Sequence, residues 1–316
     1  MSYAQQSHWR QIQSFLPTQY QLQPGQEPSE EWWQHAGHRI HLDCYRNSQA
    51  PFKVILLHGV GTNGRQMQMI LGRPLAMRGV ETIAVDMPGY GVTEVGKGAL
   101  VSYDDWVQIG CDLIDAELAR DDRPIVLYGL SAGGMETFHI AARSRKVKGI
   151  VGMTFLDQSV QQVRDTTALN RFMSRVGVPM AKAIDGTPLA RLRMPMALAG
   201  KMHTLVNNRA ALKACLKDRS SAGSWVSMRF LTSYMYYQPA CAPEDFDVCP
   251  VLLTQPAADR WTPLDLSQLF LKRISKVPVD TVMLDNAGHF PLEQPGLDQM
   301  VEAIYRFCVR VTAQGL

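Results

Sequence analysis

The residues with the clearest chemical potential are 129–133, which read Gly-Leu-Ser-Ala-Gly. Ser131 stands between an apolar run and a segment with helical periodicity, so it falls on a predicted turn from strand to helix. Such a turn projects the serine hydroxyl above the sheet, and its glycines remove Cβ atoms that would clash. The following helix offers free N–H groups and the positive end of its dipole to a developing oxyanion. Ser131 is therefore our candidate nucleophile.

A serine nucleophile needs a general base, and the base needs an acid that orients it. Asp259 follows the apolar run 250–255, and His289 follows the run 279–285. If both runs are parallel strands of one sheet, these side chains lie at carboxyl ends of strands, where ligands bind in open α/β folds. The order serine, aspartate, histidine also fits a triad on such a sheet. Asp259 and His289 are therefore the candidate acid and base.

The glycines of residues 58–64, HGVGTNG, allow a different interpretation. Their spacing is G-x-G-x-x-G, and Asp86 ends the next apolar run, as in dinucleotide-binding proteins. An NAD-dependent oxidoreductase is thus a competing hypothesis, but it leaves Ser131, Asp259 and His289 without a role. A nucleophilic serine uses the same glycines for a tight turn that aims a backbone N–H at the nucleophile. We therefore disfavour the dinucleotide interpretation, and no metal or organic cofactor is implied.

Six apolar runs provide the strands that position these residues. Continuous apolar runs are typical of strands buried on both faces of a parallel sheet. Segments with helical periodicity, such as 102–120 and 135–146, lie between the early runs, which predicts right-handed crossovers. The predicted fold class is α/β, with a mostly parallel central sheet and helices on both faces. The runs are 53–58, 80–86, 124–130, 147–157, 250–255 and 279–285.

The alternation stops between residues 158 and 247, where only helix-like patterns occur. We predict an inserted all-helical lid over 158–247, called the insertion below, a core formed by 36–157 and 248–316, and an N-terminal extension over 1–35. The insertion holds twelve Lys and Arg against six Asp and Glu, a balance of +6, and seven of the sixteen methionines. Methionine fills irregular apolar spaces, so it suits both helix packing and a pocket for an aliphatic chain.

Three histidines lie in or next to the segment 36–47, which alternates as a half-buried strand does. His35, His38 and His41 fall at three-residue intervals. On a strand that interval places successive side chains on opposite faces, so the three rings cannot converge on one metal ion. We expect exposed histidines on an edge strand and no metal site.

The motifs HGVG, DMPGYG, GLSAGG, PAADRWTP and AGHFPLEQP occur in this order, and with them the chain resembles the α/β-hydrolase superfamily over about residues 36–312. The resemblance implies that Ser131 is the nucleophile, His289 the general base and Asp259 its orienting acid. It also implies an oxyanion hole formed by the backbone N–H groups of Val60 and Ala132.

Two departures from the family pattern concern the acid. Pro256 stands where relatives usually have glycine after the strand, which could alter the Asp259 loop. Some relatives place the acid after the strand that precedes the lid, and Asp157 occupies that place here. We favour Asp259, because DRWTP matches the usual acid loop, and keep Asp157 as the alternative acid.

The function implied is that of a serine hydrolase that cleaves carboxylic esters through an acyl-enzyme, with medium or long acyl chains. Relatives that cleave epoxides or haloalkanes carry aspartate at the nucleophile position, so Ser131 argues against both reactions. The same triad also serves thioesterases, carbon–carbon bond hydrolases and cofactor-free perhydrolases, and the sequence leaves these alternatives open. The expected partner is a small-molecule ester.

Net charge and the distribution of apolar residues bear on other classes of partner. The net charge of +3 over 316 residues gives no case for nucleic-acid binding. The N-terminus lacks a secretory signal, and no apolar window has the length of a membrane span, so we expect a cytoplasmic protein without a transmembrane segment. Peripheral membrane contact through the insertion stays compatible with the sequence, and the oligomeric state stays open.

Overall fold

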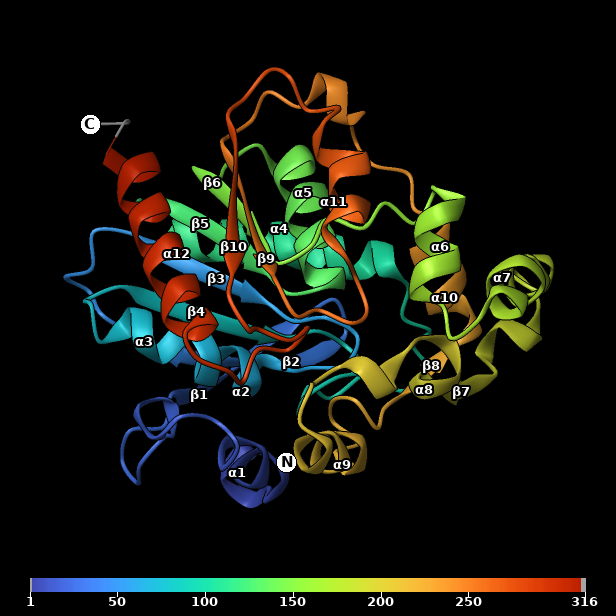
Figure 1. Ribbon diagram of the computed structural model, residues 1–316, viewed down its shortest axis with the longest axis horizontal. Coiled ribbons are helices and arrows are strands. Elements are labelled where there is room, and N and C mark those ends of the chain that lie inside the picture. The colour runs from blue at the N-terminus through green and yellow to red at the C-terminus, as the bar shows by residue number, and fades with distance from the viewer. Residues whose placement is uncertain (1, 314–316) are drawn as a thin grey trace.

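The apolar runs form the strands of one eight-stranded sheet in the computed structural model, which describes residues 2–313 (Figure 1). The strand order is β1-β2-β4-β3-β5-β6-β9-β10. β2 runs antiparallel to β1 and β4, and all other neighbours are parallel, so the predicted sheet is confirmed. The strands are β1 (Ser29–His35), β2 (His38–Tyr45), β3 (Lys53–Leu57), β4 (Glu81–Asp86), β5 (Ile125–Gly129), β6 (Gly149–Gly152), β9 (Val251–Pro256) and β10 (Val279–Leu284).

Helices cover both faces of this sheet. α4 packs on α5 so closely that a Cβ at Gly110 would lie 2.2 Å from Ile140 Cδ1. α12 packs on β9, β10 and α3, on the opposite face of the sheet (Figure 1). The helices of the core are α1 (His8–Gln13), α2 (Gly64–Met67), α3 (Arg73–Ala76), α4 (Tyr103–Arg120), α5 (Ala132–Ser144), α11 (Leu264–Leu271) and α12 (Gly296–Ala313).

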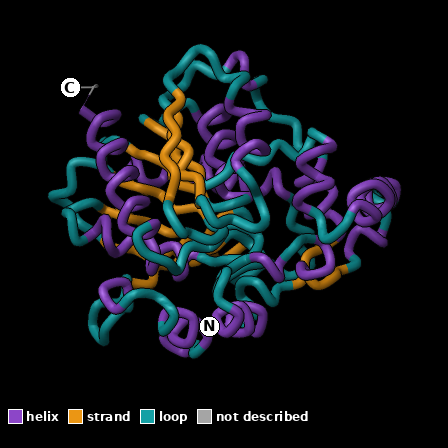
Figure 2. The backbone as a smooth tube through the Cα atoms, viewed as in Figure 1, coloured by secondary structure: helices purple, strands orange, loops and turns teal. Residues whose placement is uncertain are grey.

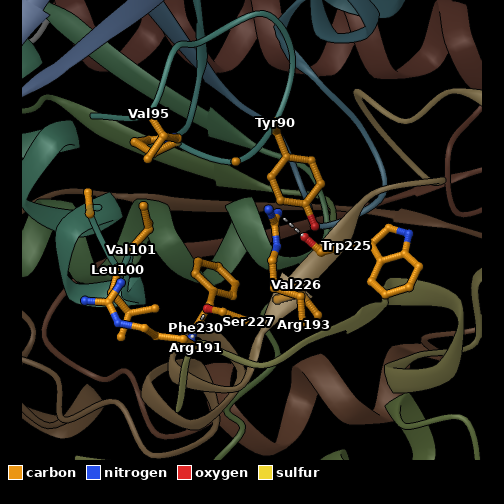
Figure 3. A pocket seen from close by; sticks show the side chains of 13 residues that line it. Tyr90, Val95, Leu100, Val101, Arg191, Arg193, Trp225, Val226, Ser227 and Phe230 are labelled. Atoms are coloured by element: carbon orange, nitrogen blue, oxygen red, sulfur yellow. Dashed lines mark hydrogen bonds between the residues drawn. The ribbon is translucent and has the colours of Figure 1, made fainter. Parts of the chain in front are cut away.

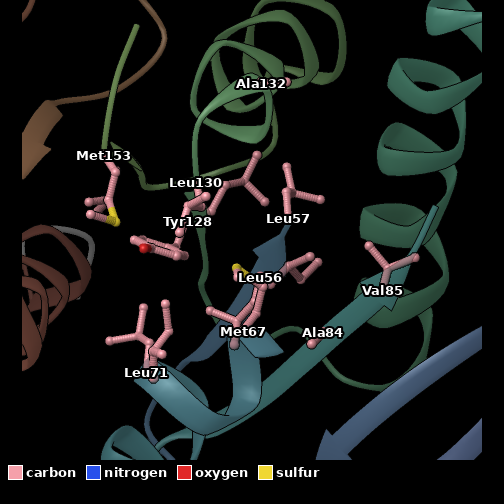
Figure 4. Close-up of a cluster of buried hydrophobic side chains, with 14 of the residues drawn as sticks. Leu56, Leu57, Met67, Leu71, Ala84, Val85, Tyr128, Leu130, Ala132 and Met153 are labelled. Atoms are coloured by element: carbon pink, nitrogen blue, oxygen red, sulfur yellow. The ribbon is translucent and has the colours of Figure 1, made fainter. Parts of the chain in front are cut away.

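The central hydrophobic cluster joins the sheet to the segment that follows the glycine loop (Figure 4). Leu56 of β3 and Val85 of β4 are fully buried in it, together with Met67 of α2 and Leu71 of the π-helical turn Gln68–Gly72. Each buried side chain of this size contributes about 1.5–3 kcal/mol of burial free energy. The packing therefore fixes the loop between β3 and α2 at the carboxyl edge of the sheet.

The N-terminal segment is more than an extension of the core. β1 lies inside residues 1–35 and pairs with β2 along its whole length, from Ser29 opposite Cys44 to His35 opposite His38. Its sequence, SEEWWQH, shows no alternation, because the residues of this outermost strand are all partly or fully exposed. α1 packs against α9 (Arg209–Lys217) of the insertion, so the N-terminal segment touches both the sheet and the insertion.

Because β1 is the outer strand, the expectation of exposed histidines on an edge strand is wrong for two of the three. His38 and His41 are buried on β2, and only His35 is partly exposed. Within residues 2–313 no group of three or more His, Cys, Asp or Glu side chains is arranged to hold a metal ion.

His41 instead joins a buried cluster of charged side chains. Its Nδ1 lies 2.9 Å from Asp86 Oδ2, and its Nε2 lies 3.1 Å from Glu30 Oε2. Asp86 Oδ1 also accepts hydrogen bonds from Tyr3 Oη at 2.9 Å and from the Gly64 N–H at 2.7 Å. Burial alone would lower the pKa of His41, but its contacts with Asp86 and Glu30 outweigh this effect and raise the pKa to about 9. The cluster ties the N-terminus to the end of β4.

We expect this raised pKa to make the folded state more stable below neutral pH than above it. Protonated His41 contributes stability that is fully present below its unfolded pKa of about 6.5 and is lost as the pH rises through about 9. His41→Gln should therefore cost on the order of 2 kcal/mol at pH 6, and less at pH 9.5. Urea unfolding across this range measures the difference.

The exposed His203 provides a matched control, and His203→Gln should leave the unfolding free energy and its pH dependence unchanged. A cost of His41→Gln that is equal at pH 6 and pH 9.5 would contradict a charged His41 in the fold.

The insertion is not purely helical, so that part of the prediction is wrong. β7 (Arg193–Pro195) and β8 (Trp225–Ser227) pair as a short antiparallel ribbon, which Figure 2 shows apart from the main sheet. Strands of three residues are too short to produce an alternating pattern. The helices of the insertion are α6 (Gln161–Thr167), α7 (Val178–Ala183), α8 (Met196–Ala199), α9 (Arg209–Lys217) and α10 (Met228–Met235).

The two halves of the insertion are tied to the core to different degrees. Phe290 N–H donates to the Leu205 carbonyl at 2.8 Å, Asn207 Nδ2 to the Ala258 carbonyl at 3.1 Å, and Gly91 N–H to the Ser220 carbonyl at 2.8 Å. By contrast, every described hydrogen bond and ion pair of residues 173–187 stays within the insertion. In the described chain no helix is long and apolar enough to cross a membrane.

Candidate active site

Ser131 lies on a sharp turn between β5 and α5, as the sequence predicts. Its φ is 56° and its ψ is −120°, a conformation that L-residues rarely adopt. The turn is tight because two of its glycines approach other backbone atoms: a Cβ at Gly129 would lie 1.9 Å from the Gly133 carbonyl oxygen, and one at Gly133 would lie 2.6 Å from that of Leu57. The glycines therefore allow the strained backbone that presents Ser131.

Asp259 and His289 meet at the carboxyl ends of β9 and β10. His289 Nδ1 lies 2.9 Å from Asp259 Oδ2, and both side chains are 1% exposed. Asp259 Oδ1 accepts from the N–H groups of Trp261 and Thr262 at 2.7 and 2.9 Å, and Thr262 Oγ1 donates to Oδ2 at 2.6 Å. Burial alone would raise the pKa of Asp259, but His289 and these hydrogen bonds hold it below its usual value. An ionised Asp259 fixes the tautomer that carries its proton on His289 Nδ1.

The other ring nitrogen of His289 is free to accept a proton. His289 Nε2 is buried and has no hydrogen-bond partner among the described residues. No described hydrogen bond joins it to Ser131 Oγ, and such catalytic hydrogen bonds are often loose before substrate binds. With Nδ1 held by Asp259, Nε2 is the basic atom of this site.

The loop after β3 packs directly on the turn of Ser131. A Cβ at Gly59 would lie 2.9 Å from Ser131 Cβ and 3.5 Å from the Ala132 nitrogen. Tyr90 Oη donates to the Val60 carbonyl at 2.8 Å, which fixes the peptide that follows Gly59. The N–H groups of Val60 and Ala132 donate no hydrogen bond within residues 2–313, so both can serve an oxyanion.

The alternative acid, Asp157, lies elsewhere. Its Oδ1 accepts from the Ser159 N–H at 2.9 Å, and its Oδ2 lies 3.7 Å from Arg273 Nη1. It makes no described contact with His289. Pro256, the departure from the family pattern, ends β9 without displacing the acid loop, because the next N–H groups still bond to residues around β10.

The glycines of the loop after β3 pack against protein atoms. A Cβ at Gly61 would lie 3.1 Å from Met202 Sδ of the insertion, and one at Gly64 would lie 2.9 Å from Asp86 Oδ1. Asp86 is fully buried and bonded to the N–H groups of Gly64 and Val92. The carboxylate that would bind a ribose is thus occupied within the protein, which contradicts the oxidoreductase alternative.

The insertion covers a cavity that contains Ser131. This central cavity measures about 40 Å³ and is lined by Val60, Ser131 and Ala132 of the core and by Met196, Phe230 and Met235 of the insertion. A second cavity, of about 60 Å³, adjoins it through shared residues and is lined almost entirely by apolar side chains of the insertion. A third, of about 170 Å³, adjoins it through Leu156, Gln158 and Tyr234.

A further cavity of about 200 Å³ lies beside the site without reaching Ser131 (Figure 3). Phe230 lines both this cavity and the central one. Tyr90, which holds the Val60 carbonyl, also lines it. Arg191 and Arg193 also line this cavity (Figure 3), and Arg193 donates to the Trp225 carbonyl at 2.7 Å. Phe230 therefore lies between the two cavities.

Comparison with known protein families identifies the family to which this fold belongs. The model of the Alpha/beta hydrolase family matches residues 54–302. The chain belongs to this family. No curated protein sequence matches it significantly.

Several solved structures have a similar fold. A soluble variant of monoglyceride lipase from Saccharomyces cerevisiae, solved with a substrate analogue, is 17% identical with a TM-score of 0.73 over 93% of this chain and 99% of the other. Paleococcus ferrophilus monoacylglycerol lipase is 21% identical with a TM-score of 0.64, over 86% and 99%. Est1E from Butyrivibrio proteoclasticus is 16% identical with a TM-score of 0.59, over 90% and 99%.

Sequence reasoning missed two residues of the site. The hydroxyl of Thr262 donates a hydrogen bond to Asp259 Oδ2, and its oxygen lies 3.1 Å from His289 Nδ1. Its position three residues after an aspartate is typical of a side chain that closes a local turn, so the sequence did hold a signal. Gln158 lines the central cavity, and its place directly after Asp157 gave no such signal.

Proposed function

We propose that the chain is a serine hydrolase that cleaves carboxylic esters through an acyl-enzyme. The observation that carries the proposal is the buried His289, held by Asp259 at one nitrogen and free at the other, beside a strained serine turn. This arrangement supplies a base, an orienting acid and a nucleophile, which a binding protein does not need.

In the first half-reaction, Ser131 Oγ attacks the acyl carbon while His289 Nε2 accepts its proton. The N–H groups of Val60 and Ala132 stabilise the tetrahedral oxyanion, and His289 then gives the proton to the departing alcohol. In the second, His289 removes a proton from water, which attacks the acyl-enzyme and releases the acid and free Ser131. Asp259 stabilises the imidazolium that forms in each half-reaction.

The experiment that tests this function is a screen of p-nitrophenyl esters of graded acyl length. We expect turnover that peaks at medium or long chains, because the 60 Å³ cavity offers an apolar continuation of the Ser131 cavity. No turnover of any ester, with a folded protein, would contradict the proposal. Turnover that is fastest with the acetyl ester would contradict the proposed chain length but not ester hydrolysis. Thioesters of the same acids, run beside them, would detect a thioesterase.

A bulky side chain in the second cavity should shorten the preferred acyl chain. Ala181 of α7 is buried in its wall, so Ala181→Phe fills space that the end of the chain would occupy. We expect kcat/KM for the longest good substrate to fall by about tenfold or more, with short esters unaffected. Ala183 lies on the same helix but is exposed, so Ala183→Phe is the matched control. Equal losses at all chain lengths would place the acyl chain elsewhere.

We further propose that residues 158–247 act as the lid of this site and make peripheral contact with lipid surfaces. Large apolar side chains are exposed on them beside a net positive charge, among them Phe172, Met180 and Leu192. Sedimentation with anionic vesicles should therefore retain more protein than with zwitterionic ones. Phe172→Glu should weaken binding to the anionic vesicles, and unchanged binding would contradict the proposed contact with lipid surfaces.

A further inference from the structure

The cavity around Ser131 continues in two directions that differ in polarity. One arm, the 60 Å³ cavity, is lined almost only by apolar side chains, five of them methionine or leucine. The other arm, of about 170 Å³ and called the polar arm below, has a mixed lining, in which apolar side chains such as Met135 and Phe270 alternate with the polar side chains of His139, Gln158, Tyr234 and Arg273. An ester has one acyl side and one alcohol side, so two arms meeting at a nucleophile match the two sides of the scissile bond.

Gln158 stands where the polar arm begins. It lines both the central cavity and the polar arm, and it is 6% exposed. Its Nε2 donates a long hydrogen bond of 3.4 Å to Tyr234 Oη, while its Oε1 has no partner among the described residues. A buried amide that keeps one end unpaired is costly, by roughly the free energy of a lost hydrogen bond. Nothing in the triad chemistry requires it.

We propose that Gln158 and Tyr234 bind a hydroxyl group on the alcohol portion of the substrate, so that the enzyme favours hydroxyl-bearing alcohol esters over simple alkyl esters. The inference rests on the proposed ester hydrolysis. A hydroxyl group donates to the free Gln158 oxygen and satisfies it, whereas an alkyl group of the same size leaves it unpaired. Burial raises the pKa of Tyr234 to about 12, so its phenol stays neutral and can donate or accept.

The test compares two esters of one fatty acid, the 2-hydroxyethyl ester and the n-propyl ester, which differ by a hydroxyl in place of a methyl group. Rates with hydroxide alone correct for their intrinsic reactivity. We expect wild type to favour the hydroxyethyl ester by about tenfold in kcat/KM. Gln158→Met removes the amide at similar length and should abolish the preference by slowing the hydroxyethyl ester only. Tyr234→Phe should weaken it in the same direction.

The exposed Gln162 of α6 gives the matched control, and Gln162→Met should leave both rates unchanged. A wild type that hydrolyses both esters equally, or a Gln158→Met variant that slows both equally, would overturn the hydroxyl site and leave the proposed function intact. A wild type that hydrolyses neither ester would overturn both. If Gln158→Met fails to fold, Tyr234→Phe decides by the same ratio.

Discussion

Ser131→Ala is expected to lower kcat for ester hydrolysis by about 10⁴-fold or more and to abolish labelling by a fluorophosphonate probe. The probe bonds covalently to an activated serine hydroxyl, and His289 can activate only the hydroxyl that its Nε2 reaches. A residual rate above that in water should persist, because the N–H groups of Val60 and Ala132 still stabilise the oxyanion. Mass spectrometry of the labelled protein and steady-state kinetics measure both effects.

The exposed Ser48 is the control for this experiment, since it lies between β2 and β3 and lines none of the cavities around Ser131. Ser48→Ala should keep full labelling and full activity. Labelling of Ser131→Ala at the wild-type level would place the nucleophile on another residue and remove the mechanism proposed above.

Asp259→Asn should have the second-largest effect, again about 10⁴-fold in kcat. The asparagine amide would offer a donor or a neutral acceptor to His289 Nδ1 in place of a carboxylate, so the ring loses both its fixed tautomer and the charge that stabilises its protonated form. The pH profile of kcat/KM should change as well, because the base of the site loses its partner.

Asp157→Asn is the matched comparison, because Asp157 was the alternative acid and contacts Arg273 instead of His289. Its effect on kcat should be small. If the two variants exchanged severity, the acid would lie after β6, and the contact between Asp259 and His289 would be structural.

The sheet and the order of the candidate residues could be predicted from the sequence, because both depend on local patterns. A strand buried on both faces has to be almost continuously apolar, so β3, β5 and β9 could be recognised as apolar runs in the sequence. The turn of Ser131 was visible because only glycine fits beside it. Once strands and turn were placed, Asp259 and His289 followed from their positions after later strands.

Features that depend on contacts between residues far apart in the sequence could not be predicted from it. β1 is stabilised by pairing with β2, and no periodicity reveals a strand whose residues are all partly or fully exposed. The burial of His41 required β1 to cover β2 and Asp86 to arrive from the end of β4. Gln158 gained its place in the cavity from the packing of α10 across the site, which helical patterns alone do not determine.

One part of the insertion is hydrogen-bonded to the core and another has no described hydrogen bond to it, so substrate specificity and catalysis depend on different parts of the insertion. Leu205 and Asn207 share hydrogen bonds with the loops that carry His289 and Asp259, so a change there reaches the reacting groups. Residues 173–187, whose described polar contacts stay inside the insertion, supply the far wall of the apolar arm. Substitutions in this outer part can therefore change which acyl chains fit and leave the reaction itself unchanged. α7 can thus vary independently of the reacting groups.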